Sequence, residues 1–329
     1  MNQVAYHRAT STEDAIGSLR QPGSVLVAGG TNLLDLMKAG VAAPQRLVDV
    51  SRLPMAEIAP TSAGGLRIGA LVRNADAANH PLVRQKYPLL SQALLAGASP
   101  QLRNMATMGG NLMQRTRCYY FYDTAYTACN KREPGSGCAA RGGYNRIHAI
   151  LGASEQCIAT NPSDMSVALL ALSASVRVAG LEGERVIPLA DFHRLPGDHP
   201  ERDTTLAAGE LITAIELPPS RFTEHAHYLK LRDRASYAFA LVSVAVGLDM
   251  GSGIVQDAAL ALGGVAHKPW RMPLAERALI GQPLSEGSAA HAADVLLAHA
   301  VDQGHNGFKI ELARRSIQRA LLNAAGGQA

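Results

Sequence analysis

The sequence predicts a mixed α+β protein, in which a region of alternating strands and helices comes first and a separate α+β domain follows. Three observations predict this architecture. The chain has 329 residues, and a single hydrophobic core stops growing at roughly 250–300 residues, so more than one domain is expected. Apolar strand-like runs alternate with helical patterns through the first two thirds of the chain. The composition then changes near residues 219–224, after two consecutive prolines.

Strands and helices alternate in the first part. A short strand is expected at Val4–His7, followed by a helix that Ser11 or Thr12 begins, with two acidic residues in its first turn. Further strands and helices are expected in residues 24–40 (a strand, a double glycine and a helix), 46–53, 64–80, 88–98, 164–180 (a helix and then a strand) and 211–219, while 180–210 is expected to be mixed and rich in loops.

The second part begins after the segment Pro219–Thr223. Two strand-like runs, "HYLKLRD" and "FALVSVAVGLDM", are followed by a third strand and a loop in "VQDAALALGGVAHKPWRM". Helical patterns then cover residues 273–280, 287–303 and 308–324.

Composition and charge exclude several classes of protein. Hydrophobic residues make up 47% and charged residues 18% of the chain, as in soluble globular proteins. The net charge of +4 is too small to indicate nucleic-acid binding. No run reaches the roughly 18 apolar residues of a transmembrane helix, so no membrane insertion is expected. The N-terminus lacks the apolar core of a signal peptide, so any export is expected to depend on a partner.

Two double-glycine turns are candidates for binding phosphate. In "VLVAGGTNLLDLMK" a strand ends at Gly29-Gly30 and a helix follows, which exposes backbone N–H groups at the positive end of a helix dipole. "TMGGN" provides a second such turn at residues 107–111. Either could be an ordinary tight turn, but together they could hold the two phosphates of a dinucleotide. Neither matches the G-x-G-x-x-G or P-loop pattern.

All four cysteines lie between residues 113 and 160. Disulfides are typical of small secreted domains without a large core, and zinc ribbons use C-x2–4-C pairs, which are absent here. Unrelated buried thiols would not explain why the cysteines share one segment. A [4Fe-4S] cluster can take four thiolates from a long irregular loop, and the glycines, aromatic residues and arginines of the segment suit it. These readings stay open; the four candidate ligands are Cys118, Cys129, Cys138 and Cys157.

The two turns and the segments "IATNPSDMSVALLALSASVRV", "YLKLRDRASYAFALVSVAV" and "ALALGGVAHKPWRMPLAE" resemble the FAD subunits of the xanthine dehydrogenase family. The cysteine segment is most similar to the insertion of molybdenum-dependent aldehyde oxidoreductases; the 4-hydroxybenzoyl-CoA reductase β subunit is the second choice. The resemblance implies a two-part α/β FAD-binding PCMH-type domain at 1–221, with a [4Fe-4S]-binding insertion at about 113–160, and a CO dehydrogenase flavoprotein-like C-terminal α+β domain at 222–329.

The resemblance also implies which residues bind the cofactors. The four cysteines would be the [4Fe-4S] ligands. Asp164 and Lys230 match positions that contact FAD. Asp164 could instead cap the helix at 165–172, and Lys230 could instead be a solvated strand residue. The implied FAD-binding residues are Leu26, Val27, Ala28, Gly29, Gly30, Thr31, Asn32, Leu33, Thr107, Gly109, Gly110, Asn111, Asp164 and Lys230.

The implied function is electron transfer within a heterotrimer. A molybdenum-cofactor subunit would oxidise aldehydes to carboxylic acids, and a [2Fe-2S] subunit would pass the electrons through FAD of this chain to an external electron acceptor. No catalytic residue is expected here. The complex would be periplasmic by co-export with a partner, or cytoplasmic. A free-standing flavin oxidase and a zinc-stabilised binding module are the alternatives.

Overall fold

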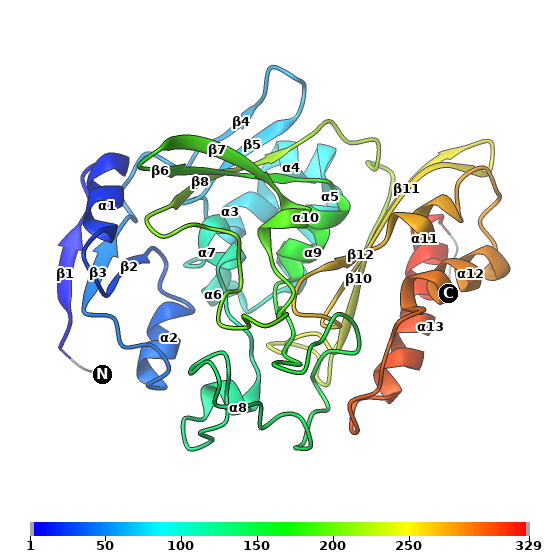
Figure 1. The fold of residues 1–329 in the computed structure, drawn as a ribbon. Coiled ribbons are helices and arrows are strands. Elements are labelled where there is room, and N and C mark those ends of the chain that lie inside the picture. Colours follow the sequence, from blue (N-terminus) through cyan, green and yellow to red (C-terminus); the bar gives the residue numbers. More distant parts are fainter. Residues whose placement is uncertain (1–2, 327–329) are drawn as a thin grey trace.

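Three β-sheets follow one another across the molecule in the computed structural model, which describes residues 3–326 (Figure 1). The first sheet has three parallel strands in the order β1-β3-β2, and the chain crosses over between them through helices, as parallel pairing requires. The side-chain oxygen of Ser11 accepts a hydrogen bond from the backbone N–H of Asp14, which confirms the predicted start of the first helix. The elements are β1 (Ala5–Arg8), α1 (Thr12–Leu19), β2 (Ser24–Val27), α2 (Leu33–Lys38) and β3 (Arg46–Asp49).

The second sheet is antiparallel, with its five strands in the order β4-β5-β8-β6-β7. Helices cover the face that looks toward the middle of the molecule (Figure 1). The eight residues of α9 are all buried, because this helix packs between the second sheet and the third. The elements are β4 (Ile58–Pro60), β5 (Leu66–Gly69), α3 (Asn74–Asn79), α4 (Pro81–Lys86), α5 (Pro88–Ala96), α6 (Pro100–Arg103), α7 (Met108–Leu112), α9 (Asp164–Ala171), β6 (Ser175–Gly180), β7 (Gly183–Pro188), α10 (Leu189–Phe192) and β8 (Leu211–Leu217).

The third sheet belongs to the C-terminal part and is antiparallel, in the order β12-β11-β10-β9. Its two long strands are joined by Ser252 and Gly253, both at positive φ, as in a two-residue hairpin turn. One face packs on α5 and α9, and the other on the last helices. The elements are β9 (His225–Leu231), β10 (Val242–Gly251), β11 (Ile254–Gly263), β12 (Trp270–Arg271), α11 (Pro273–Arg277), α12 (Glu286–Leu297) and α13 (Phe308–Ala324).

The cysteine segment joins α7 to α9 and lies below the sheets in Figure 1. It is almost entirely loop, apart from the short helix α8 (Tyr119–Tyr122). Its apolar residues pack on Leu36 of α2, while Asn145 and His148 bond to the loop before α13. The segment therefore connects the first sheet unit with the C-terminal domain.

Residues 180–210 are mixed and rich in loops, as expected, and they hold the strand β7 and the short helix α10. β7 is an exposed edge strand, and its polar sequence hides the alternation of a half-buried strand. One expectation about secondary structure was wrong. The helix expected at 287–303 ends at Leu297. The domain boundary at 221/222 stays a prediction; it falls in the segment between β8 and β9. No helix in residues 3–326 is long and apolar enough to cross a membrane.

Candidate functional site

The first double-glycine turn lies between β2 and α2. A Cβ on Gly29 would lie 1.9 Å from the carbonyl oxygen of Met105, so no other residue fits without moving the backbone. Gly30 has a φ of 71°, which favours glycine. The first turn therefore packs directly against the backbone just before the second turn.

The second turn begins α7. The Thr107 hydroxyl caps this helix by accepting a hydrogen bond from the Gly110 N–H at 3.1 Å. The Gly109 N–H donates to the carbonyl of Ala70 at the end of β5 at 2.8 Å, and a Cβ on Gly109 would lie 3.0 Å from the Ala70 Cβ. Both turns therefore bring bare backbone to one place between the first two sheets.

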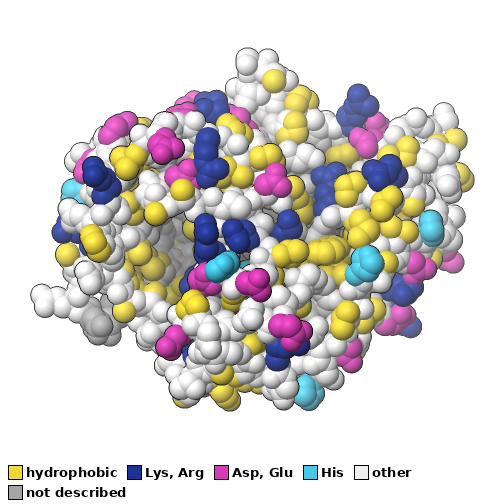
Figure 2. All heavy atoms as spheres, in the orientation of Figure 1, with side chains coloured by type: hydrophobic (Ala, Val, Ile, Leu, Met, Phe, Trp, Pro, Cys, Tyr) yellow, Lys and Arg dark blue, Asp and Glu magenta, His cyan; other side chains and the backbone are white. Residues whose placement is uncertain are grey.

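Two cavities meet at these turns. One, of about 440 Å³, lies between the first two sheets, and Figure 2 shows a hollow with hydrophobic side chains there. The other, of about 650 Å³, is bordered by Met105, Tyr237 and Phe239. A dinucleotide fits this arrangement, because its two halves flank a central pyrophosphate. Both cavities are lined by Gly29, Gly30, Thr31, Asn32 and Gly110.

Most of the predicted FAD residues line these cavities. Asn111 lines only the larger one, and its side chain accepts a hydrogen bond from Ser163 at 2.8 Å. The predicted FAD residues that line the 440 Å³ cavity are Leu26, Val27, Ala28, Gly29, Gly30, Thr31, Asn32, Leu33, Thr107, Gly109 and Gly110.

Asp164 and Lys230 lie apart from the two large cavities and form a buried ion pair. The Lys230 Nζ is 2.8 Å from Asp164 Oδ2, and Tyr228 donates to the other carboxylate oxygen at 2.8 Å. Asp164 borders two smaller cavities of about 270 and 60 Å³. It does not cap α9, because the Ser163 hydroxyl does so. Burial and the Asp164 charge raise the pKa of Tyr228 well above its ordinary value, so Tyr228 stays a hydrogen-bond donor.

The structure brings the four cysteines together in one apolar cluster. Cys118, Cys129 and Cys157 are buried and Cys138 is half-buried; all four are free thiols. Burial, reinforced by the neighbouring thiols, raises the pKa of Cys118 to about 12 and that of Cys157 to about 11, although nearby Lys131 opposes the latter. Within residues 3–326, no group of three or more His, Cys, Asp or Glu side chains is arranged to hold a metal ion. Their role as ligands stays a prediction.

His148 contacts the cysteine cluster directly. Its Nε2 lies 3.1 Å from Cys118 Sγ. Burial and the Lys309 charge lower the pKa of His148 to about 4, so the ring is neutral at neutral pH.

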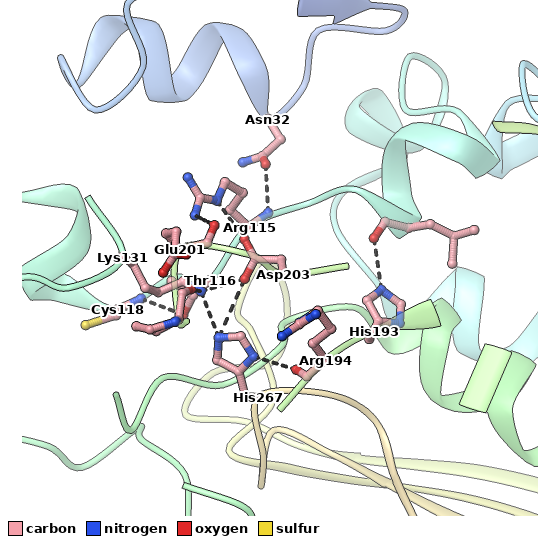
Figure 3. Close-up of polar contacts among 12 residues, drawn as sticks. Asn32, Arg115, Thr116, Cys118, Lys131, His193, Arg194, Glu201, Asp203 and His267 are labelled. Carbon is pink, nitrogen blue, oxygen red and sulfur yellow. Dashed lines mark hydrogen bonds and ion pairs between the residues drawn. The ribbon is translucent and has the colours of Figure 1, made fainter. Parts of the chain in front are cut away.

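A network of charges lies beside the cluster, with Lys131 and His267 buried and Asp203 and Arg115 half-buried (Figure 3). Lys131 donates to Asp203 at 2.5 Å and to His267 Nε2 at 2.7 Å, and Arg115 Nε donates to the other Asp203 oxygen at 2.7 Å. Burial acts to raise the pKa of Asp203, but the opposing effect of the Lys131 and Arg115 charges is larger and lowers this pKa to about 2. The Arg115 backbone N–H donates to Asn32 Oδ1 at 2.9 Å, so the network reaches the first glycine turn.

Two family models match the chain. Residues 2–220 match the FAD binding domain in molybdopterin dehydrogenase, and residues 195–324 match the CO dehydrogenase flavoprotein C-terminal domain. The chain belongs to this family of molybdopterin dehydrogenase flavoproteins. The predicted fold class, a PCMH-type FAD-binding domain followed by this C-terminal domain, is confirmed, and the chain is an FAD-binding oxidoreductase subunit.

Curated relatives and solved structures of the family span nearly the whole chain. The aldehyde oxidoreductase FAD-binding subunit PaoB of Escherichia coli is 53% identical over 98% of this chain and 99% of its own. The glyceraldehyde dehydrogenase medium chain of Sulfolobus acidocaldarius is 28% identical over 86% and 83%. The structure of carbon monoxide dehydrogenase from Hydrogenophaga pseudoflava superposes with a TM-score of 0.77 at 26% identity, covering 99% of this chain and 98% of that one.

Several residues near the candidate site of this flavoprotein are not predicted by the sequence. Phe239 lines the larger cavity and packs under the Arg117 guanidinium, 4.8 Å from its ring centroid. Ala98 lines the same cavity with a φ of 52°. His148 was also missed. No spacing connects these residues with the glycine turns, because folding alone brings them together.

Proposed function

We propose that this chain is the FAD-binding electron-transfer subunit of a heterotrimeric molybdenum aldehyde oxidoreductase. The observation that carries the proposal is the 53% identity to the E. coli aldehyde oxidoreductase FAD-binding subunit over essentially the full length of both chains. In the proposed complex, a molybdenum-cofactor subunit oxidises the aldehyde to a carboxylic acid. A [2Fe-2S] subunit passes the electrons to this chain, and an external acceptor receives them.

FAD, when bound, supplies a centre that collects electrons and hands them on. The chain would hold it through the backbone of the two turns, where Gly29 and Gly110 line both cavities. Apolar side chains such as Leu71 and Ile212 on the wall of the 440 Å³ cavity would exclude water from one half of the cofactor. We assign no catalytic acid, base or nucleophile to this chain, because its part is to hold the cofactor.

We further propose that Cys118, Cys129, Cys138 and Cys157 bind a [4Fe-4S] cluster. Their burial in one apolar group supports this, because iron bound by the four thiolates would offset the negative charge that such a group disfavours. The Ala159 N–H donates to Cys157 Sγ at 3.4 Å, a contact of the kind that stabilises cluster sulfur. A four-iron cluster takes its thiolates at separate corners, so the four side chains need not converge on one ion.

Analysis of the purified complex tests the cofactor assignments. The complex is expected to contain flavin, iron and acid-labile sulfide in this subunit, and the Cys129→Ser variant should lose the iron and sulfide of this subunit. Tyr144→Phe is a matched control in the same segment, because Tyr144 is exposed, and it should keep both. Zinc in place of iron, or full iron and sulfide in Cys129→Ser, contradicts the cluster assignment.

Turnover assays test the assignment of function. The complex should oxidise aldehydes, and this chain alone should not. Turnover by the isolated chain would identify a free-standing flavin oxidase, whereas reduction of an aromatic acyl-CoA by the complex would identify a 4-hydroxybenzoyl-CoA reductase-like enzyme. The compartment stays a prediction; fractionation of cells that make this chain with and without its partners tests co-export.

A further inference from the structure

We propose that His148 sets the reduction potential of the cysteine-bound cluster by donating its Nε2–H to the sulfur of Cys118. This inference rests on the proposed [4Fe-4S] cluster and assigns His148 a positioning role rather than a catalytic or ligating one. Reduction adds negative charge to the cluster and its thiolates, so a fixed N–H dipole aimed at a ligand sulfur favours the reduced form. His148 should therefore raise the midpoint potential.

The hydrogen-bond geometry decides which ring nitrogen carries the proton. Nε2 lies 3.1 Å from Cys118 Sγ, whereas Nδ1 is buried and has no hydrogen-bond partner among residues 3–326. A proton on Nδ1 would leave a buried donor without an acceptor, which is unfavourable. The tautomer with the proton on Nε2 satisfies the only polar contact of the ring, and a thiolate sulfur bound to iron is its acceptor.

The C-terminal domain holds His148 in place through its backbone. Asn306 Nδ2 donates to the carbonyls of His148 and Ala149, each at 3.1 Å. The Lys309 Nζ donates to the His148 carbonyl at 2.8 Å and to that of Gly264 at 2.6 Å. Both side chains are fully buried. This double support explains how a loop residue can keep one orientation toward the sulfur, which a potential-setting contact requires.

Lys131 also lies close to the cluster, but its charge is largely compensated. Its ammonium is buried two residues after Cys129 and is held by the Asp203 carboxylate at 2.5 Å. A neutralised ion pair has a weaker net effect on the potential than an unopposed dipole that points at a ligand atom. The Ala159 N–H, which contacts Cys157 Sγ at 3.4 Å, is a backbone group, whereas His148 contacts Cys118 Sγ through its side chain and can be replaced.

The experiment is an EPR-monitored redox titration of the whole complex. His148→Leu removes the donor and keeps apolar bulk. We expect the cluster to remain and its midpoint potential to become more negative by about 59 mV, the one-electron equivalent of a tenfold lower equilibrium constant. His148→Gln keeps an N–H and should shift the potential by less than half as much. His193→Leu is the matched control, because this buried histidine bonds a backbone carbonyl (Leu112, 3.0 Å) instead of sulfur, and the potential should not move.

Each outcome separates this inference from the cluster assignment. A wild-type complex without a [4Fe-4S] signal overturns the cluster and the inference together. A cluster whose potential is the same in His148→Leu overturns the inference alone. In case the variant does not fold, pulsed EPR of the wild-type complex with ¹⁵N-labelled histidine decides. A weak nitrogen coupling to the reduced cluster supports a hydrogen bond, whereas a strong coupling typical of a ligand, or no coupling at all, overturns it.

Discussion

The buried pair between Asp164 and Lys230 allows a quantitative test of what joins the two domains. It ties the first residue of α9 to β9 of the C-terminal sheet, and only 7% and 4% of the two side chains are exposed. Replacement of one partner in such a pair leaves an uncompensated buried charge, which costs roughly 3–5 kcal/mol. We therefore expect Lys230→Met to lower the free energy of unfolding by about 4 kcal/mol, because Asp164 would keep only its hydrogen bond from Tyr228.

The assay is chemical denaturation of the FAD-free protein, which separates the ion pair from any contact with the cofactor. The double variant Asp164→Asn/Lys230→Met removes both charges and should recover part of the lost stability. Arg67→Met is the control. Arg67 and Glu216 form an ion pair between β5 and β8, and 53% of the arginine side chain is exposed. Loss of this pair should lower the free energy of unfolding by less than about 1 kcal/mol. A Lys230→Met protein within 1 kcal/mol of wild type would refute the reasoning. Flavin content, measured in parallel, tests the FAD contacts that the resemblance implies.

Three further predictions concern the glycine turns and the buried histidines. Gly29→Ala should reduce bound flavin at least about tenfold, because its Cβ would lie 1.9 Å from the Met105 oxygen; flavin absorbance after desalting measures this, and an unchanged ratio contradicts it. Thr107→Ala should cost about 1 kcal/mol through loss of the α7 cap, with Thr107→Ser close to wild type in the same denaturation assay. Burial lowers the pKa of His193 and His267 to about 4. In the unfolded chain these histidines take up protons near pH 6.5, so the folded state is favoured fully above that pH. The free energy of unfolding should fall by up to about 3 kcal/mol for each histidine as the pH drops from about 6.5 to 4. Urea denaturation across this range should show the decline, and a flat profile contradicts it.

The parts of the fold that sequence predicts are those determined by local chemistry. Ser11 caps α1 within its own turn, and Gly29-Gly30 marks the end of β2 because a strand must stop where the backbone turns sharply. β7 could not be predicted in this way, because an exposed edge strand needs no apolar alternation and is defined by its neighbour β6.

The candidate site likewise has parts that the sequence predicts and parts that depend on tertiary contacts. The glycine turns and the shared neighbourhood of the cysteines follow from composition and short spacing. The charge network does not, since Lys131 is 72 residues from Asp203 and 136 from His267. Three tertiary contacts had to form before these groups met, and each group alone is typical of a solvated surface. Their burial becomes tolerable only because each charge faces its partner.

Hydrogen bonds fasten the cysteine segment to both neighbouring parts of the fold. The segment leaves α7 directly after the second turn, and its first residues return to the first turn through the Arg115 N–H and Asn32 Oδ1. At its other end, Asn306 and Lys309 of the C-terminal domain fix the backbone around His148. The two domains are therefore coupled through this segment, because displacing the cysteine cluster would break contacts in both domains at once. Occupancy of the proposed [4Fe-4S] site should thus stabilise the wall of the flavin cavity, and bound flavin should stabilise that site to the same extent, since coupling between two binding sites is reciprocal.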